Sequence, residues 1–202
     1  METLLLKKRY IPGLDDFYAL LRNTPVISAV KSDEGLEKTL SGDTAKSSGL
    51  VFILFGDILT ITDIVERIKK AGKLALVHID LIEGLASREI AADFLWKNTR
   101  ADGILSTKAN LIRHAKSLGF LTIQRFFVLD SMALLNIEKQ CPLEYADAVE
   151  ILPGIIPRVI QRIAHIAGKP IIAGGLIEDK EDVRNALESG ASSVSSSNTG
   201  LL

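Results

Sequence analysis

Cysteine, histidine and aromatic residues are scarce in this chain of 202 residues. The one cysteine, Cys141, has no partner for an internal disulfide, so we expect a buried and unreactive thiol. Three scattered histidines argue against a metal centre, and no cofactor is predicted. Aromatic residues make up only 5% of the chain, which gives little support for base stacking with a nucleic acid.

Long apolar runs and an excess of one charge are also missing. No run reaches the ~18 apolar residues that a membrane span needs. At the start of the chain Lys7, Lys8 and Arg9 follow three leucines, which is the wrong order for a signal peptide. The formal net charge of −1, from 24 basic and 25 acidic residues, does not indicate nucleic-acid binding. We therefore expect a cytoplasmic protein with no membrane partner.

Short apolar runs, by contrast, are frequent, and 47% of the residues are hydrophobic. Eight runs are rich in Val, Ile, Leu and Phe and lack the polar alternation of a half-exposed strand. Such runs are typical of parallel strands that are covered on both faces. The predicted strands are Pro25–Val30, Leu50–Phe55, Leu74–Ile79, Gly103–Leu105, Phe120–Val128, Ala148–Leu152, Pro170–Ala173 and Ala191–Ser195.

Helical periodicities lie between these runs, most clearly over residues 62–71, 87–98 and 155–167. Repetition of strand and helix predicts a compact (β/α)8 barrel of the TIM type, formed by one domain over residues 1–202. A doubly wound parallel sheet is the alternative.

The end of the chain departs from a complete barrel. Only a short tail, residues 198–202, follows the eighth predicted strand, so the last helix is missing or vestigial. We expect the N-terminal segment, residues 1–24, or a second copy of the chain to cover the exposed sector, and a homodimer is therefore expected. The apolar residues of that segment are Leu14, Phe17, Leu20 and Leu21.

Polar residues gather where the predicted strands end, which is where barrels of this type bind ligands. Gly174 and Gly175 follow the seventh strand and three serines follow the eighth, and the backbone N–H groups of these two loops commonly bind phosphate. The alternative is a tight turn and a solvated tail. The predicted ligand-binding residues are Lys31, Asp80, Lys108, Arg125, Glu150, Gly174, Gly175, Ser195, Ser196 and Ser197.

The charged members of this set have a structural alternative. Lys31 could form an ion pair inside the barrel with Asp80 or Glu150. His78 is expected to point inward and to be held by a neighbouring carboxylate, rather than to act as an acid–base catalyst.

Several longer strings resemble one family, the glycerol uptake operon antiterminators called GlpP. The resemblance extends from residue 25 to residue 198 and includes the order and spacing of the motifs. The strings are VHIDLIEGLAS (77–87), ADGILSTKANLI (101–112), TIQRFFVLDSMAL (122–134), ADAVEILPGIIP (146–157), PIIAGGLI (170–177) and VSSSN (194–198).

This resemblance implies a bacterial regulator that senses glycerol 3-phosphate and acts on leader messenger RNA to prevent premature termination of transcription. It implies no catalytic reaction. The barrel would then be an enzyme-like scaffold used as a receptor.

The distribution of charge offers a surface for RNA. Residues 103–129 and 151–177 contain no Asp or Glu but several basic residues. On neighbouring helices these could form a positive sector that contacts phosphates, although a solvated helix face is the alternative. The predicted RNA-binding residues are Arg113, Lys116, Arg158, Arg162 and Lys169.

Two other functions compete with the regulator. One is a barrel enzyme with a phosphorylated substrate, an isomerase or a lyase, in which Lys31, Asp80 or Glu150 moves a proton. The other is a metabolite-binding module that acts through a protein partner and never touches RNA.

Overall fold

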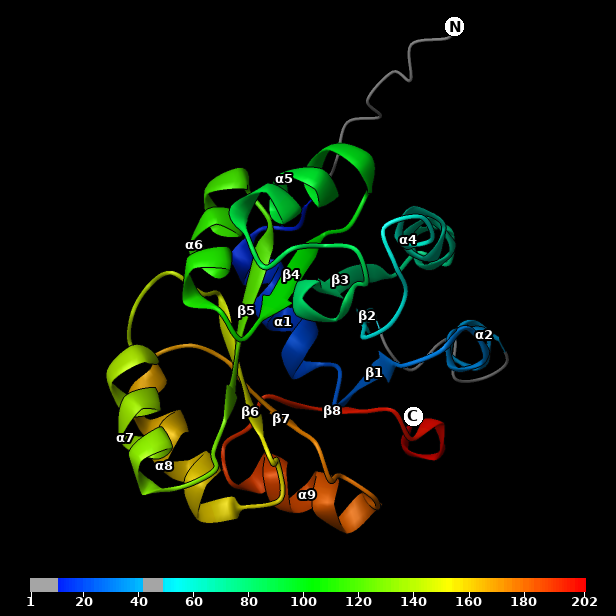
Figure 1. Ribbon diagram of the computed structural model, residues 1–202. Coiled ribbons are helices and arrows are strands. Elements are labelled where there is room, and N and C mark those ends of the chain that lie inside the picture. The colour runs from blue at the N-terminus through cyan, green and yellow to red at the C-terminus, as the bar shows by residue number, and fades with distance from the viewer. Residues whose placement is uncertain (1–10, 42–48) are drawn as a thin grey trace, which may run out of the picture.

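The computed structural model describes residues 11–41 and 49–202. Eight parallel strands close into a barrel in which sequence neighbours are sheet neighbours (Figure 1). The ring closes where β1 pairs with β8, in the register Val26↔Val194 and Ser28↔Ser196. The predicted (β/α)8 barrel is therefore confirmed, and the doubly wound sheet is excluded. The strands are β1 (Val26–Val30), β2 (Leu50–Ile53), β3 (Leu74–His78), β4 (Gly103–Ser106), β5 (Leu121–Phe127), β6 (Ala148–Leu152), β7 (Ile171–Gly174) and β8 (Ser193–Ser196).

Helices surround this ring and begin and end at residues suited to helix termini. Side chains of Asp130 and Asp179 accept hydrogen bonds from the first turns of α7 and α9, and Gly119 and Gly168 end α6 and α8 in the left-handed conformation. The helices are α1 (Leu14–Arg22), α2 (Asp33–Leu40), α4 (Ile61–Lys70), α5 (Glu89–Asn98), α6 (Ala109–Leu118), α7 (Ser131–Gln140), α8 (Pro157–Ala167) and α9 (Lys180–Glu188), with 3-10 turns η1 (Ile79–Leu81) and η2 (Thr199–Leu201). None of the described helices is long and apolar enough to cross a membrane.

Alternation along the strands divides the apolar core into an inner and an outer part. Inward side chains such as Ile27, Phe52 and Ile123 form one cluster inside the barrel. Outward side chains such as Val51 and Val194 pack under the surrounding helices in separate clusters. Burial on both faces explains why the strands read as unbroken apolar runs.

The N-terminal helix lies at a different place from the one expected. Phe17 and Leu21 of α1 are fully buried against the inward residues of the barrel, and the Ser193 hydroxyl donates to the Leu21 carbonyl oxygen over 2.7 Å. Helix α1 therefore closes the end of the barrel where the strands begin, and Figure 1 shows it behind the strands at the centre of the view.

The sector beside β8 is instead covered by the chain's last residues. Within the described residues β8 is followed by the turn η2, whereas an α-helix follows β7. Leu201 and Leu202 pack against the outer cluster that contains Val26 and Val194. The described part of the N-terminal segment, helix α1, does not cover this sector, because its apolar face packs into the end of the barrel where the strands begin.

The closure of the barrel by α1 predicts a specific loss of stability. Phe17→Ala should lower the free energy of unfolding by about 3 to 5 kcal/mol, because removal of the ring leaves a cavity between α1 and the inner core. Leu14→Ala, in the same helix but 45% exposed, should change it by less than about 0.5 kcal/mol. Urea unfolding followed by circular dichroism measures both. Equal effects of the two substitutions would contradict the role assigned to α1.

Candidate ligand-binding site at the barrel mouth

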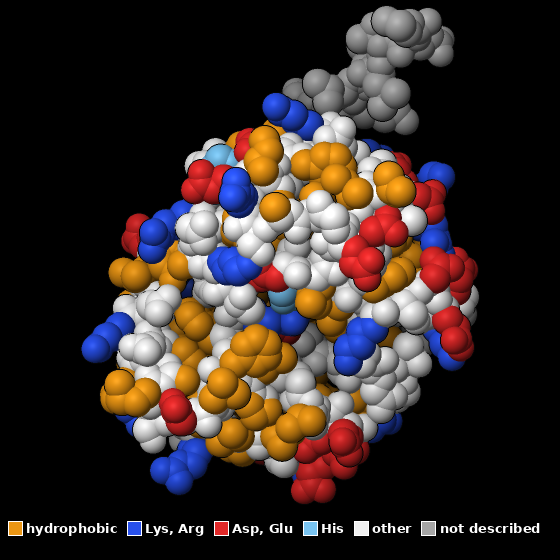
Figure 2. Space-filling view, in the orientation of Figure 1, with side chains coloured by type: hydrophobic (Ala, Val, Ile, Leu, Met, Phe, Trp, Pro, Cys, Tyr) orange, Lys and Arg blue, Asp and Glu red, His pale blue; other side chains and the backbone are white. Residues whose placement is uncertain are grey.

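A cavity of about 160 Å³ opens where the strands end. In Figure 2 the hollow lies near the centre of the face, with basic and histidine side chains visible inside it. The cavity brings together many of the predicted ligand-binding residues, although Asp80, Lys108 and Gly174 do not line it. The predicted residues that line it are Lys31, Arg125, Glu150, Gly175, Ser195, Ser196 and Ser197.

The floor of the cavity is built around the carboxylate of Glu150, which is fully buried. One oxygen accepts a hydrogen bond from Arg125 Nε, and the other accepts one from Ser195 Oγ, both over 2.6 Å. Adjacent strands bring these residues together, because β5 and β6 pair Arg125 with Glu150 directly. The ion pair inside the barrel is therefore Arg125–Glu150, and Lys31 takes no part in it.

Gly174 is required by this cluster. A Cβ atom at Gly174 would lie 2.6 Å from Ser195 Oγ and 2.7 Å from Glu150 Oε1. Any side chain there would have to displace the buried carboxylate or its hydroxyl donor. Gly174 thus makes room for the floor of the site and does not line the cavity itself.

The loop after β7 has an unusual backbone. Gly175 has φ +76°, and Leu176 has φ +60°, the only positive value at a non-glycine residue in the described chain. A left-handed leucine is strained, and strain of this kind clusters at ligand-binding sites. Among the described residues, no acceptor is found for the backbone N–H groups of Leu176 and Ile177, which lie beyond the end of β7. Two consecutive donors therefore remain available beside the cavity, an arrangement suited to an anion.

The loops after β7 and β8 are joined to each other. Ser196 Oγ donates to the Ile177 carbonyl oxygen over 3.2 Å, and Asn198 Nδ2 donates to the Glu178 carbonyl oxygen over 3.0 Å. Ser196 Oγ also accepts from the Asn198 backbone N–H. The hydroxyls of Ser195 and Ser196 are therefore engaged within the protein, whereas Ser197 is exposed at the rim.

Lys31 supplies an available positive charge at the rim. Its side chain is exposed and lines the cavity, and no ion pair involves it within residues 11–41 and 49–202. An ammonium group free of carboxylates can balance the charge of a bound anion.

Asp80 and Lys108 lie together across the mouth from this loop pair. Asp80 Oδ2 accepts from Ser106 Oγ and from the Thr107 backbone N–H, each over 2.8 Å, and Lys108 Nζ lies 3.7 Å from Asp80 Oδ1. Asp80 thereby ties the loops after β3 and β4 together.

His78 is an inward residue that the sequence places correctly. It is buried with its Nδ1 atom 3.9 Å from Asp80 Oδ2, and within the described part of the chain Nδ1 makes no hydrogen bond. Burial, with a contribution from the Arg125 charge, lowers the pKa of His78 to about 4. His78 is therefore neutral at physiological pH.

Cys141 is buried as expected, and burial raises the pKa of its thiol to about 12, which makes it unreactive.

The predicted RNA-binding residues are dispersed over the outside. Arg158 is exposed in the first turn of α8, and Arg162 forms two hydrogen bonds with Glu138 of α7. Arg113 lies over the Tyr145 ring, 5.0 Å from its centroid.

Two of the residues predicted to bind RNA, Lys116 and Lys169, instead bind the loop before β6. Lys116 Nζ binds the Glu144 carbonyl oxygen over 2.6 Å, and Lys169 Nζ binds the carbonyl oxygens of Leu143 and Ala146. This loop lies at the end of the barrel opposite the mouth. Lys116 and Lys169 thus have structural partners that the sequence pattern did not indicate.

The fold and the mouth define a class of protein, a (β/α)8 barrel with a cavity at the carboxyl ends of its strands, bordered by the loops after β7 and β8. The chain belongs to the glycerol-3-phosphate responsive antiterminator family, whose family model matches residues 26–202. The family resemblance inferred from the motifs is thereby confirmed.

Relatives of known sequence or structure agree with this assignment. The chain is 42% identical over 182 residues to the uncharacterized protein YgcP of Escherichia coli, with 90% of this chain and 93% of that protein covered. The crystal structure of a glycerol uptake operon antiterminator regulatory protein from Listeria monocytogenes is 36% identical with a TM-score of 0.79, covering 87% and 93%. A glycerol uptake operon antiterminator-related protein from Thermotoga maritima is 32% identical with a TM-score of 0.76, covering 88% and 97%.

Aldolases share only the fold with this chain. The deoxyribose phosphate aldolase from Aeropyrum pernix, for example, is 16% identical with a TM-score of 0.66, over 94% of this chain and 96% of that one. Such a likeness carries no argument about chemistry.

The lowered pKa of His78 predicts how stability depends on pH. The folded protein keeps His78 neutral down to about pH 4, whereas the unfolded chain takes up the proton near pH 6.5. Acid therefore favours the unfolded chain between these values, at a cost of about 3 kcal/mol by pH 4. His78→Gln should remove this part of the pH dependence. Urea titrations at pH 7 and pH 4 measure it, and equal losses for both proteins would contradict a depressed pKa.

Proposed function

We propose that this chain senses glycerol 3-phosphate at the mouth of its barrel and acts in response on the leader of a messenger RNA as an antiterminator. Membership of the glycerol-3-phosphate responsive antiterminator family supports both halves of this function. The family is one of regulators, so the enzyme alternative has no support from it. Engagement of both Glu150 oxygens within the protein also argues against Glu150 as a catalytic base.

The observation that carries the ligand site is the strained loop after β7. We place the phosphate against the N–H groups of Leu176 and Ile177, with Lys31 and Ser197 at its other side. The hydroxyls of the ligand then face the Arg125–Glu150 pair at the floor of the cavity. Leu54 and Leu152 supply apolar walls for its carbon atoms. Asp80 and Lys108 stand further out, where Lys108 adds positive charge to the mouth.

The RNA surface is proposed on the helices that follow β4 and β6. Arg158 carries most of this proposal because it is exposed in the first turn of α8. Arg162 follows one turn later, and an RNA phosphate would compete with Glu138 for its guanidinium. Arg113, Lys116 and Lys169 extend the basic surface away from the mouth.

We also propose that the chain works in the cytoplasm as a homodimer. Support comes from large apolar side chains that remain exposed beside the mouth, on the loops after β5 and β7 and at the start of α7. Figure 2 shows hydrophobic side chains gathered next to the hollow. Contiguous exposed apolar surface of this kind marks an interaction site. The exposed residues are Phe127, Leu129, Met132 and Leu176.

The phosphate site predicts the effect of blocking the β7 loop. Gly175→Val places a branched side chain at φ +76° and within 3.2 Å of the Leu152 side chain, so glycerol 3-phosphate affinity should fall at least tenfold. The matched control is Gly72→Val, which meets the same backbone strain at φ +75° in open space far from the mouth. Calorimetric titration measures both. Wild-type affinity in Gly175→Val would rule out this loop as the phosphate site.

The RNA surface predicts a change in affinity that depends on salt. Arg158→Glu with Arg162→Glu should weaken binding to leader RNA roughly tenfold or more, and reduce the slope of log K against log salt by about one to two. Glycerol 3-phosphate affinity should stay unchanged. Lys180→Glu with Arg184→Glu, the same charge change on α9, is the control. Fluorescence anisotropy at several salt concentrations measures both pairs, and equal RNA affinity for the two double variants would reject the α8 surface.

A further inference from the structure

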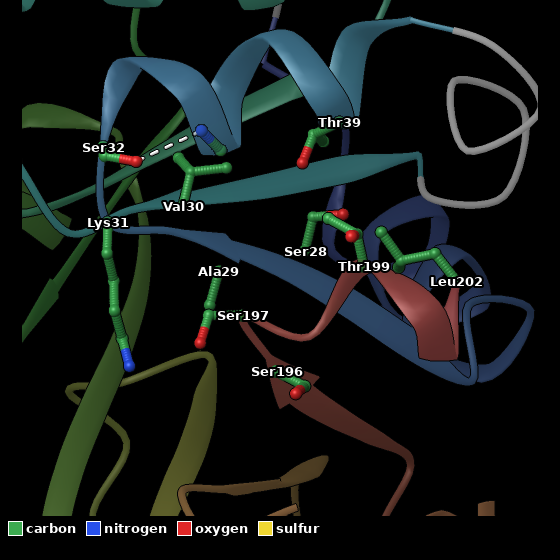
Figure 3. A pocket seen from close by; sticks show the side chains of 11 residues that line it. Ser28, Ala29, Val30, Lys31, Ser32, Thr39, Ser196, Ser197, Thr199 and Leu202 are labelled. Carbon is green, nitrogen blue, oxygen red and sulfur yellow. Dashed lines mark hydrogen bonds between the residues drawn. The ribbon is translucent and has the colours of Figure 1, made fainter. Parts of the chain in front are cut away.

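A second cavity, of about 180 Å³, lies on the outside of the barrel beside β8. It is enclosed by β1, α2, the end of β8 and the turn η2, on the outer side of the strands (Figure 3). Hydroxyl groups dominate its polar surface. They belong to Ser28, Ser32, Thr39, Ser196, Ser197 and Thr199, of which Ser32 Oγ accepts a hydrogen bond from the Gly35 N–H.

Ser28 is the residue that the packing of the barrel leaves unexplained. It lies on the outer face of β1, between the inward residues Ile27 and Ala29, and is only 2% exposed. Its Oγ atom is buried and has no hydrogen-bond partner within the described residues. A buried hydroxyl without a partner costs about 1 to 3 kcal/mol, so a position covered only by protein would favour valine. The cavity in front of Ser28 is where a partner can bind.

The lining selects the chemistry of that partner. Lys31 stands at one edge, and among the residues that the structure describes no carboxylate side chain lines the cavity. Hydroxyl donors and acceptors without a strong charge suit an uncharged polyol group. A cavity of about 150 Å³ holds a molecule the size of benzene, so this one accommodates about six non-hydrogen atoms, the size of glycerol.

The two cavities meet at the rim of the barrel. Ala29, Lys31, Ser196 and Ser197 line both of them. In Figure 3 the Lys31 and Ser197 side chains extend from the loops after β1 and β8, away from Thr39 and toward the barrel. A phosphate held at Lys31 and Ser197 would therefore lie between the mouth on one side and the hydroxyl-lined cavity on the other.

We propose that the cavity between β1, α2, β8 and η2 is a second subsite that binds an uncharged polyol group, with Ser28 Oγ as its buried hydrogen-bond partner. The polyol arrives either as a free molecule or as the second alcohol of a phosphodiester whose phosphate lies at the mouth. The second route rests on the proposed function, because it takes the phosphate position from there.

The test is calorimetric titration of the full chain with three probes. The probes are glycerol 3-phosphate, glycerol added to protein saturated with glycerol 3-phosphate, and glycerophosphoglycerol, in which one phosphate joins two glycerols. Glycerol or glycerophosphoglycerol should bind, and Ser28→Ala should weaken that binding about fivefold to tenfold while leaving glycerol 3-phosphate affinity unchanged. Ser28→Thr retains the hydroxyl and should bind more tightly than Ser28→Ala.

The outcomes test the polyol subsite and the proposed glycerol 3-phosphate site separately. Binding of free glycerol that depends on Ser28 identifies the free polyol as the source, and such binding of the diester alone identifies the phosphodiester. Failure of both probes, or equal affinity in wild type and Ser28→Ala, overturns the subsite even where glycerol 3-phosphate still binds. If glycerol 3-phosphate fails to bind while glycerol binding still depends on Ser28, the subsite stands and the proposed function falls. Thr39→Val provides a second variant if Ser28→Ala does not fold.

Discussion

The buried carboxylate of Glu150 is the group on which the mouth of this barrel depends. It lies at the centre of the ring, where an isolated charge would cost several kcal/mol of desolvation, and it is retained because Arg125 and Ser195 satisfy its two oxygens. Those partners come from β5 and β8, so the carboxylate links strands on both sides of β6. The space it needs leaves room only for glycine at position 174. The two residues after Gly174 are Gly175 and Leu176. Both adopt the left-handed conformation, which presents N–H groups to the cavity.

The surface over β8 and β1 is covered differently from the rest of the barrel. Within the described residues, the turn η2 and the final leucines pack there. The loop after β8 is held instead by side-chain contacts to the loop after β7, through Ser196 and Asn198. The loops after β7 and β8, which we propose bind the phosphate, therefore hold each other in place.

The sequence predicted the order of elements well because a strand buried on both faces has an unmistakable apolar run. It could not place α1, since the amphipathic pattern of Leu14 to Arg22 shows that one face is buried but not which surface receives it. The sequence offered a pairing of Lys31 with Asp80 or Glu150 only as an alternative and did not indicate Arg125, because the partner of Glu150 depends on strand register and Arg125 lies 25 residues away. Nothing in the residue type of Leu176 signals a positive φ. Lys116 and Lys169 bind backbone carbonyl groups, which every residue carries, so no pattern of side chains could reveal those contacts.

The coupling that an effector-controlled antiterminator requires has a direct route through the loop after β6. The Gly154 N–H donates to the Gly175 carbonyl oxygen over 3.1 Å, and a Cβ atom at Gly154 would lie 2.7 Å from the backbone of Ala173 and Gly174. The β6 loop thus rests against the proposed phosphate loop with no intervening side chain. Three residues after Gly154, α8 begins at Pro157 and carries Arg158 in its first turn. A ligand that orders the β7 loop therefore acts on the start of the helix proposed to face RNA. The coupling free energy between two such sites is usually about 1 to 3 kcal/mol, so a difference of this size between two positions of the β6 and β7 loops is sufficient.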